Sequence, residues 1–173
     1  YYRALMIEQD QRSAHHYFNN NKDVTGKVFV DVGCAEGYSS LEIIEEAKHV
    51  YLFEQNESWL EAIRATFEPW KDKVTIVQKY VSNRNSPKEQ KPDEHLFIKM
   101  DIEGAERRAL AGCEQLFRDC KKIDFAICTY HLHDDEEVIS AFLDKHNCTY
   151  RNQKGFFRHK IRSVVLRGNK KVN

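Results

Sequence analysis

The stretch Val28-Phe29-Val30-Asp31-Val32-Gly33-Cys34-Ala35-Glu36-Gly37-Tyr38 decides how this chain folds. Its first five residues form a β-branched, apolar run without in/out alternation, which is typical of a strand buried on both faces of a parallel sheet. The two glycines then permit a tight turn and a close approach of the backbone to a ligand. Residues from Tyr38 onward have the 3.6-residue apolar spacing of a helix. The stretch therefore predicts a strand, a ligand-binding turn and a helix.

Outward from this unit, the same alternation repeats along the chain. The pattern predicts an amphipathic helix over Tyr2–Phe18, and further strands over 50–53, 74–77 (running towards Val81), 95–100 and 123–128. Helices are expected over 38–49, 58–67, 105–117 and 134–146. Strand-like segments 148–151 and 161–166 are too close together for a crossover helix, so they predict an antiparallel hairpin. Between Ser82 and His95, two prolines in a polar stretch predict no crossover helix.

Strands that alternate with helices imply a doubly wound α/β fold with a mostly parallel sheet. The chain has 173 residues, the length of one domain. We expect an N-terminal helical segment over 1–23 and a Rossmann-like core over 24–173. No second domain is indicated.

Composition narrows the class of protein. Apolar residues make up 41% and aromatics 12%, and 27 basic residues balance 27 acidic ones, which argues against disorder and against a duplex-binding protein. No run is long enough to span a bilayer, and no leader opens the chain. The five cysteines form no C-x-x-C pair. These features predict a reduced, cytoplasmic protein.

Charge is nevertheless uneven. Residues 150–173 contain eight Lys or Arg and no acid. This segment is read either as a solvated hairpin or as a patch that attracts an anionic substrate or a membrane headgroup. It also keeps nucleic acid open as an acceptor, although the zero net charge argues against that class.

The first turn and the second strand together predict the cofactor. The glycine spacing matches neither the dinucleotide G-x-G-x-x-G motif nor a phosphate loop, which disfavours a nicotinamide-dependent dehydrogenase. Asp31 at the end of the first strand suits an ammonium group. Glu54 ends the second strand at the distance from Gly33 where a carboxylate accepts hydrogen bonds from ribose hydroxyls. An amino-acid head and a ribose together describe S-adenosylmethionine.

Several motifs resemble those of one enzyme family. Residues 30–41 resemble the first motif of class I methyltransferases, and Phe53-Glu54-Gln55-Asn56 resembles their second-strand motif. The block Ile98-Lys99-Met100-Asp101-Ile102-Glu103-Gly104-Ala105-Glu106 closely resembles the fourth-strand signature of the FkbM methyltransferases, and Ile127-Cys128-Thr129-Tyr130-His131 their fifth-strand ending. The chain departs from the pattern at Ala35, where Gly is common, and at Gln55, where Pro is common.

This resemblance implies a seven-stranded class I methyltransferase sheet that binds S-adenosylmethionine and methylates hydroxyl groups of sugars or small metabolites. It also implies the residues that bind the cofactor. These are Asp31, Gly33, Cys34, Ala35, Glu36, Gly37 and Tyr38 of the first turn, Glu54 and Gln55 (with Glu54 on the ribose), Val81 and Ser82 beside the adenine, and Asp101 near the sulfonium.

Methyl transfer to a hydroxyl requires alignment and a base that takes the proton. Asp101 and Glu103 follow the fourth strand, and His131 and His133 follow the fifth. We expect His131 to be the base, with Asp101 beside it, because an imidazole titrates near neutral pH. The same four groups could instead hold a divalent metal, although no fixed-spacing motif supports one. A binding domain of the same fold without catalysis is the other alternative. Glu106 is expected to cap a helix or pair with Arg107 or Arg108.

Overall fold

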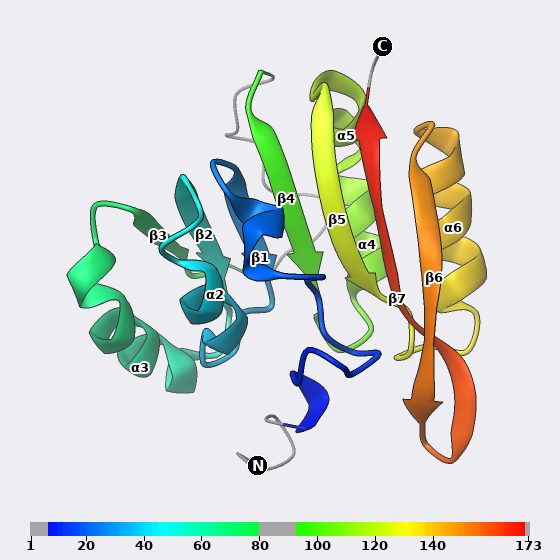
Figure 1. Ribbon diagram of the computed structural model, residues 1–173, viewed down its shortest axis with the longest axis horizontal. Helices are drawn as coiled ribbons and strands as arrows, with labels where there is room; N and C mark the ends of the chain where they lie inside the picture. Colours follow the sequence, from blue (N-terminus) through cyan, green and yellow to red (C-terminus); the bar gives the residue numbers. More distant parts are fainter. Residues whose placement is uncertain (1–6, 80–92, 172–173) are drawn as a thin grey trace.

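The computed structural model describes residues 7–79 and 93–171, and its centre is a seven-stranded sheet in the order β3-β2-β1-β4-β5-β7-β6 (Figure 1). The strands are β1 Val28–Val32, β2 His49–Phe53, β3 Val74–Val77, β4 His95–Met100, β5 Lys122–Cys128, β6 Thr149–Phe157 and β7 Lys160–Lys171. The first five are parallel, and β7 pairs antiparallel with both β5 and β6. The predicted doubly wound sheet with a C-terminal antiparallel hairpin is confirmed.

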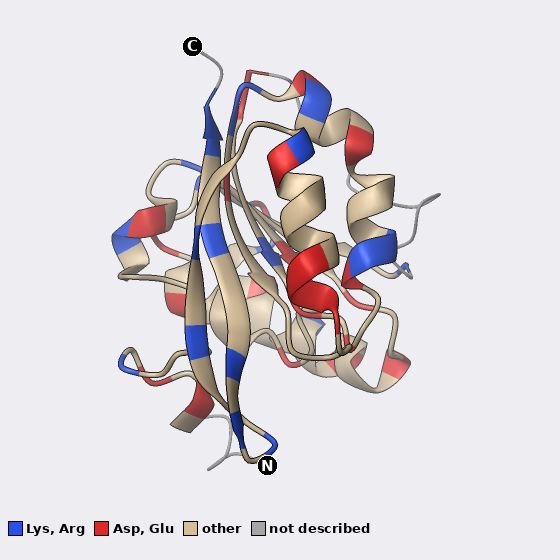
Figure 2. Cartoon of the chain, turned by 90° about the vertical axis from the view of Figure 1, so that its right-hand side faces the viewer, with Lys and Arg blue, Asp and Glu red and all other residues tan. Residues whose placement is uncertain are grey.

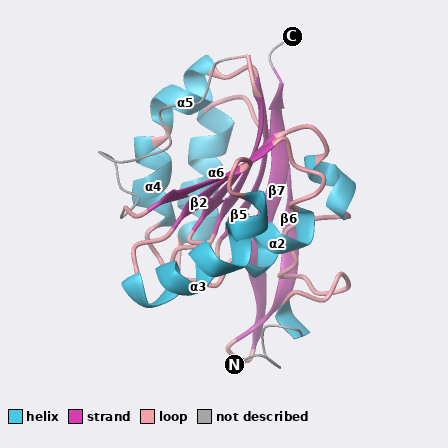
Figure 3. Ribbon diagram, turned by 90° about the vertical axis from the view of Figure 1, so that its left-hand side faces the viewer, coloured by secondary structure: helices cyan, strands magenta, loops and turns pink. Residues whose placement is uncertain are grey.

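Helices cover both faces of this sheet (Figure 3). They are α2 Tyr38–Ile43 and α3 Glu57–Phe67 on one face, and α4 Glu106–Gly112, α5 Glu114–Asp119 and α6 Asp135–Lys145 on the other. Two short 3₁₀ helices, η1 Asn21–Val24 and η2 Glu68–Trp70, complete the set within the described ranges. Because both faces are covered, every residue of β1 is buried. This explains why its sequence lacks alternation.

The N-terminal segment differs from the prediction. Within its described part only residues 7 and 8 are helical, and residues 9–18 form turns and bends. The consecutive side chains of His16, Tyr17 and Phe18 are all buried, a pattern that a helix lying on a surface cannot produce. Phe18 packs against Phe29 and Phe97, with ring centroids 5.7 and 5.5 Å away. Tertiary packing therefore determines this segment's shape.

Two other helices are shorter than predicted. The helix expected over residues 38–49 ends with Ile43, and the chain turns before β2 begins at His49. The helix expected over residues 105–117 is divided into α4 and α5 at Cys113. The polar link from Ser82 to His95 falls largely outside the described residues.

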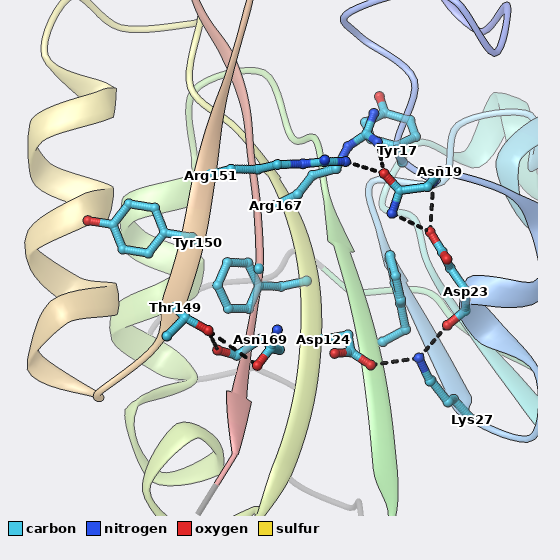
Figure 4. Close-up of a pocket in the computed structure, with 13 residues that line it drawn as sticks. Tyr17, Asn19, Asp23, Lys27, Asp124, Thr149, Tyr150, Arg151, Arg167 and Asn169 are labelled. Carbon is cyan, nitrogen blue, oxygen red and sulfur yellow. Dashed lines mark hydrogen bonds and ion pairs between the residues drawn. The ribbon is translucent and has the colours of Figure 1, made fainter.

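The β6–β7 hairpin carries the basic residues that the sequence singled out (Figure 2). Some of them have structural roles: the buried Lys170 ammonium donates to the carbonyls of Phe117, Arg118 and Cys120. Arg151 and Arg167 face each other across the two strands, and both guanidinium groups donate to the side-chain oxygen of Asn19. These bonds attach the N-terminal segment to the hairpin (Figure 4).

Candidate functional site

The strand order reverses between β1 and β4, and two adjoining cavities open at the carboxyl ends of these strands. This switch point is where ligands bind in open α/β sheets. The first cavity, of about 390 Å³, extends towards β2 and is lined by Glu54, Gln55, Asn56, Trp59 and Lys79 among others. The second, of about 220 Å³, extends towards the N-terminal segment and is lined by Glu8, Gln9, Tyr17, Glu36, Tyr38, Ser39 and Lys99 among others. Both share Gly33, Ala35, Asp101 and Glu103.

Glycine is required at the start of the turn after β1. Gly33 has φ +81°, and a Cβ there would lie 2.0 Å from the backbone oxygen of Asp101. Only a residue without a side chain lets the two strand ends approach so closely. Ala35, two residues on, has φ 47°, a left-handed conformation that glycine adopts more easily. The departure from the family pattern at Ala35 therefore carries a local conformational cost.

Glu54 lies at the mouth of the first cavity, where its carboxylate organises the loop. It accepts hydrogen bonds from the backbone N–H groups of Ala35 at 3.0 Å, Gln55 at 2.8 Å and Asn56 at 2.7 Å. Gln55 thus uses an N–H that the proline common in the family would lack. The position of Glu54 agrees with its predicted ribose-binding role, and its carboxylate connects the turn after β1 with the end of β2.

Asp31 does not lie where the sequence suggested. The residue is fully buried and lines neither cavity. Its carboxylate forms an ion pair with Lys99 at 2.9 Å and accepts a 2.7 Å hydrogen bond from Ser40. Asp31 was expected to bind the ammonium group of a ligand, but its partner is the ammonium group of Lys99. Burial alone would lower the pKa of Lys99, but the charges of Asp31 and Asp101 raise it above its usual value.

The other residues predicted to bind the cofactor do not all line the same cavity. Glu36 and Tyr38 line the second cavity and Gln55 lines the first, whereas Gly37 is the N-cap residue before helix α2 and lines neither. Cys34 lines the second cavity, but it is buried, and burial raises the pKa of its thiol. Val81 and Ser82 lie outside the described residues. The structure thus gathers most of the first-turn residues around the two cavities.

Asp101 lies at the junction of the two cavities and is held by two tyrosines. The hydroxyl groups of Tyr17 and Tyr130 donate to its Oδ2 at 2.6 and 3.1 Å. Burial would raise the pKa of Asp101, but the Lys99 charge, these hydroxyls and His131 lower it overall, so the carboxylate stays ionised. Neither tyrosine was among the site residues predicted from the sequence. Tyr130 directly precedes His131, whereas Tyr17 gave no signal because it is 84 residues away.

His131 is the predicted base, and its ring bridges three carboxylates. Its Nε2 lies 3.4 Å from Asp101 Oδ1 and 3.5 Å from Glu103 Oε2, and its Nδ1 lies 2.9 Å from Glu106 Oε1. Burial would lower the pKa of His131, but the bond to Glu106 and the charges of Glu106, Asp101 and Glu103 raise it overall. The ring thus contacts Glu106 on one side and, on the other, Asp101 and Glu103, which line both cavities, although His131 itself lines neither.

Glu106 has a different partner from the one expected. Its fully buried carboxylate accepts a 2.8 Å hydrogen bond from the N–H of Ile102 and contacts His131. The bond to Ile102 satisfies a backbone donor in the turn before α4, but no side chain caps α4, so the expected capping role is not found. Arg107 pairs with Asp134 and Asp135 instead, so the expected pairing with that arginine is wrong.

Three of the four groups proposed for a metal come together. Asp101, Glu103 and His131 each offer a ligand atom, and these atoms lie within 4.8 Å of one another. His133 lies apart, in a shallow depression lined also by Asp134 and Glu137. One imidazole and two carboxylates could bind a divalent transition metal.

A further cavity, of about 410 Å³, lies away from the switch point (Figure 4). Lys27, Phe97, Asp124, Arg151 and Asn169 are among the residues around it. Phe97 and Asp124 lie near the starts of β4 and β5, so the cavity opens towards the opposite edge of the sheet. It contains none of the predicted site residues.

Comparisons with known proteins agree with this geometry. Residues 5–152 match the family described as the Methyltransferase FkbM domain. No protein of curated function matches the chain significantly. Within the described residues, no helix is long and apolar enough to cross a bilayer.

Several solved structures share the fold. Methyltransferase FkbM from Methylobacillus flagellatus KT superposes with a TM-score of 0.63 and 18% identity, over 83% of this chain and 43% of that one. Magnesium protoporphyrin IX methyltransferase from Synechocystis PCC 6803, with bound SAM, superposes with a TM-score of 0.60 and 13% identity. The match covers 86% of this chain and 72% of that one. An rRNA methylase from Streptococcus thermophilus superposes with a TM-score of 0.62 and 12% identity, over 88% of this chain and 92% of that one. The chain spans less than half of the Methylobacillus protein, and identities this low establish the fold alone.

Proposed function

This chain belongs to the FkbM methyltransferase family, and we propose that it transfers the methyl group of S-adenosylmethionine to a hydroxyl group of a sugar or small metabolite. The observation that carries the proposal is the pair of cavities joined at Asp101, with Glu54 lining one of them and His131, which itself lines neither, in contact with Asp101. One cavity is suited to a cofactor and the other to an acceptor.

The residues present fit S-adenosylmethionine. Gly33 lines both cavities, and the first cavity has the volume of a nucleoside-sized site. Glu54 would hold the ribose hydroxyls, and Gln55 and Trp59 would border the same compartment. Asp101, an ionised carboxylate at the junction, would stabilise a positive sulfonium through its charge. When bound, the cofactor supplies an electrophilic methyl group.

His131 would remove the proton of the acceptor hydroxyl. Nδ1 lies 2.9 Å from the Glu106 carboxylate, a contact that favours the proton on Nδ1, and Nε2 lies on the side of Asp101. In the neutral ring, Nε2 and Asp101 Oδ1 are both acceptors, and they lie 3.4 Å apart. An acceptor hydroxyl placed beside these two atoms can donate its proton to Nε2, which is the arrangement that general-base catalysis requires.

The second cavity supports a hydroxylated, non-phosphorylated acceptor. Glu8, Glu36, Asp101 and Glu103 line it, and Lys99, which lines it too, is already paired with Asp31. Carboxylates repel phosphate groups and accept hydrogen bonds from sugar hydroxyls. This argues against RNA, although an rRNA methylase shares the fold. Because Glu8, Gln9 and Tyr17 contribute to the cavity, we also propose that the N-terminal segment belongs to the same single domain.

Calorimetry with S-adenosylhomocysteine tests the cofactor assignment. We expect one site, with binding weakened in Glu54→Ala and retained in the matched variant Glu57→Ala. Absence of binding to the full protein would overturn the proposal. Labelled methyl donor, offered with extracts of sugars and metabolites, then separates an enzyme from a binding domain, because only an enzyme yields a labelled product.

A metal-assisted methyltransferase is the second candidate, since Asp101, Glu103 and His131 could bind one ion. Treatment with a chelator, followed by addition of Mn²⁺ or Zn²⁺, distinguishes the two. Under the base mechanism, turnover does not change on chelation. Loss of turnover that the metal restores would favour the second candidate.

A further inference from the structure

The tip of the β6–β7 hairpin, residues 154–162, combines exposed apolar and basic side chains. Phe156 and Ile161 are cross-strand partners and are 68% and 76% exposed. Lys154, Arg158 and Lys160 are exposed around them, and residues 154–162 contain no acid. Within the described ranges, none of these three cations forms an ion pair with a carboxylate. Arg158 lies over the Phe157 ring, 5.2 Å from its centroid, so among the described residues these cations lack carboxylate partners, and the apolar pair stays exposed.

The hairpin tip is rigidly connected to the candidate site. Phe157 packs against the Tyr130 ring at a centroid distance of 4.6 Å, and Arg162 donates to the backbone oxygens of Thr129 and Leu132. Adjacent strand residues point to opposite faces, so Phe156 points away from the contact that Phe157 makes. Because Phe157 and Arg162 hold the hairpin in this orientation, the Phe156 side chain is exposed.

The hairpin tip projects at the same edge of the sheet as the two cavities. Residue 165 of β7 pairs with Cys128, the last residue of β5, so the residues before it extend beyond the carboxyl ends of the parallel strands (Figure 1). Two more exposed apolar side chains belong to this edge: Leu132 follows β5, and Ile7 precedes Glu8 of the second cavity. The acids of this edge, such as Glu8 and Glu103, surround the cavities.

We propose that the hairpin tip docks on an anionic lipid bilayer, with Phe156 and Ile161 entering the headgroup region and Lys154, Arg158 and Lys160 contacting lipid phosphates and carboxylates. A protein binds a membrane surface in this way when apolar side chains and surrounding cations act together. A second copy of the chain is a poor partner, because two tips of like charge repel each other. RNA is a weaker fit, because the aliphatic Ile161 offers no flat ring for a base to stack on.

Docking would also orient the candidate active site. Because the cavities and the tip share one edge, the second cavity would open close to the membrane surface. Resting on the proposed function, this predicts that the acceptor hydroxyl is presented at a lipid surface. The tip itself needs neither cofactor nor acceptor in order to bind.

Vesicle sedimentation tests the proposal. We expect the protein to sediment with vesicles of equimolar phosphatidylcholine and phosphatidylserine, and much less with phosphatidylcholine alone. The variant Phe156→Ser/Ile161→Ser should bind about 100-fold more weakly, at about tenfold per side chain. Lys160→Gln should cost about fivefold. Leu41→Ser/Val138→Ser, which changes exposed apolar residues on helices α2 and α6, is the matched control and should bind normally.

Thermal melts of each variant, compared with the parent, establish that it is folded. The proposal is overturned if anionic vesicles bind no better than neutral ones, or if the tip variant binds as well as the control. It is also overturned if the tip binds single-stranded RNA but not vesicles. Failure of S-adenosylhomocysteine to bind would contradict the proposed function and leave the vesicle result unaffected, so the two proposals fail separately.

Discussion

Glu106 Oε1 lies 2.9 Å from His131 Nδ1, and the Glu106 side chain is completely buried. A buried carboxylate beside one ring nitrogen favours one tautomer of the imidazole and orients the other nitrogen, here towards Asp101 and Glu103. The backbone N–H of Ile102 holds the same carboxylate oxygen at 2.8 Å. Glu106 is therefore placed to act as a positioning residue for His131.

Replacing Glu106 with Gln should reduce turnover about 100-fold or more, because the imidazole loses both its orienting carboxylate and the charge that stabilises its protonated form. The pH profile should also shift to lower pH, since Glu106 contributes to raising the pKa of His131. Cofactor affinity should not change. The measurements are pH–rate profiles and calorimetry, with the exposed Glu57→Gln as control. An unshifted profile would assign Glu106 a purely structural role.

Removing the base itself should have the larger effect. His131→Ala should lower turnover by about 10²–10⁴-fold, with S-adenosylhomocysteine affinity nearly intact. Under the proposed mechanism only the neutral imidazole accepts a proton, and the pKa of His131 is raised above its usual value of 6.5. Activity should therefore rise with pH and reach half of its maximum above pH 6.5. Near-normal turnover of His131→Ala, combined with loss of activity in Asp101→Ala, would favour the metal-assisted mechanism.

Glu54→Ala should weaken binding of S-adenosylhomocysteine by roughly 10- to 100-fold, the usual cost of losing hydrogen bonds to a charged group. Part of the loss would come from the loop, because Glu54 also holds the N–H groups of Ala35, Gln55 and Asn56. Adenine affinity, measured separately, reports this loop contribution. An unchanged affinity for S-adenosylhomocysteine would show that the ribose lies elsewhere.

The Asp31–Lys99 pair should be important for stability. Lys99→Met leaves Asp31 as an unpaired buried charge and should cost about 3–5 kcal/mol of unfolding free energy. The double variant Lys99→Met/Asp31→Leu should recover much of this loss, because neither charge then remains buried. Urea denaturation of the four proteins in this cycle provides the measurement. Additive losses in the double variant would mean that the two side chains are not coupled.

Gly33→Ala should destabilise the fold by about 3 kcal/mol or more, because a Cβ at this left-handed position would lie 2.0 Å from the Asp101 backbone oxygen. Gly26 is a matched control: its φ is also positive, at +71°, but a Cβ added there would have no other atom within 4 Å. Gly26→Ala should therefore cost only about 1 kcal/mol. Equal denaturation midpoints for the two variants would contradict the close approach.

By itself, the sequence determined the α/β alternation, the parallel core, the terminal hairpin and the family. These depend on local patterns: an apolar run without alternation at residues 28–32, and fixed motifs such as the block from Asp101 to Glu106. It also suggested His131, Asp101 and Glu54 as candidates, because Glu54 and Asp101 directly follow β2 and β4 and His131 lies three residues after the end of β5.

Only the tertiary structure decided what these side chains contact. Asp31 pairs with Lys99 because neighbouring parallel strands bring the two residues into register. Tyr17 reaches Asp101 because the N-terminal segment, held by Asn19, folds back over the sheet instead of forming a helix. Local patterns encode which face a residue occupies. Burial of an ionisable group instead depends on a partner far away in the chain, which only the packed fold supplies.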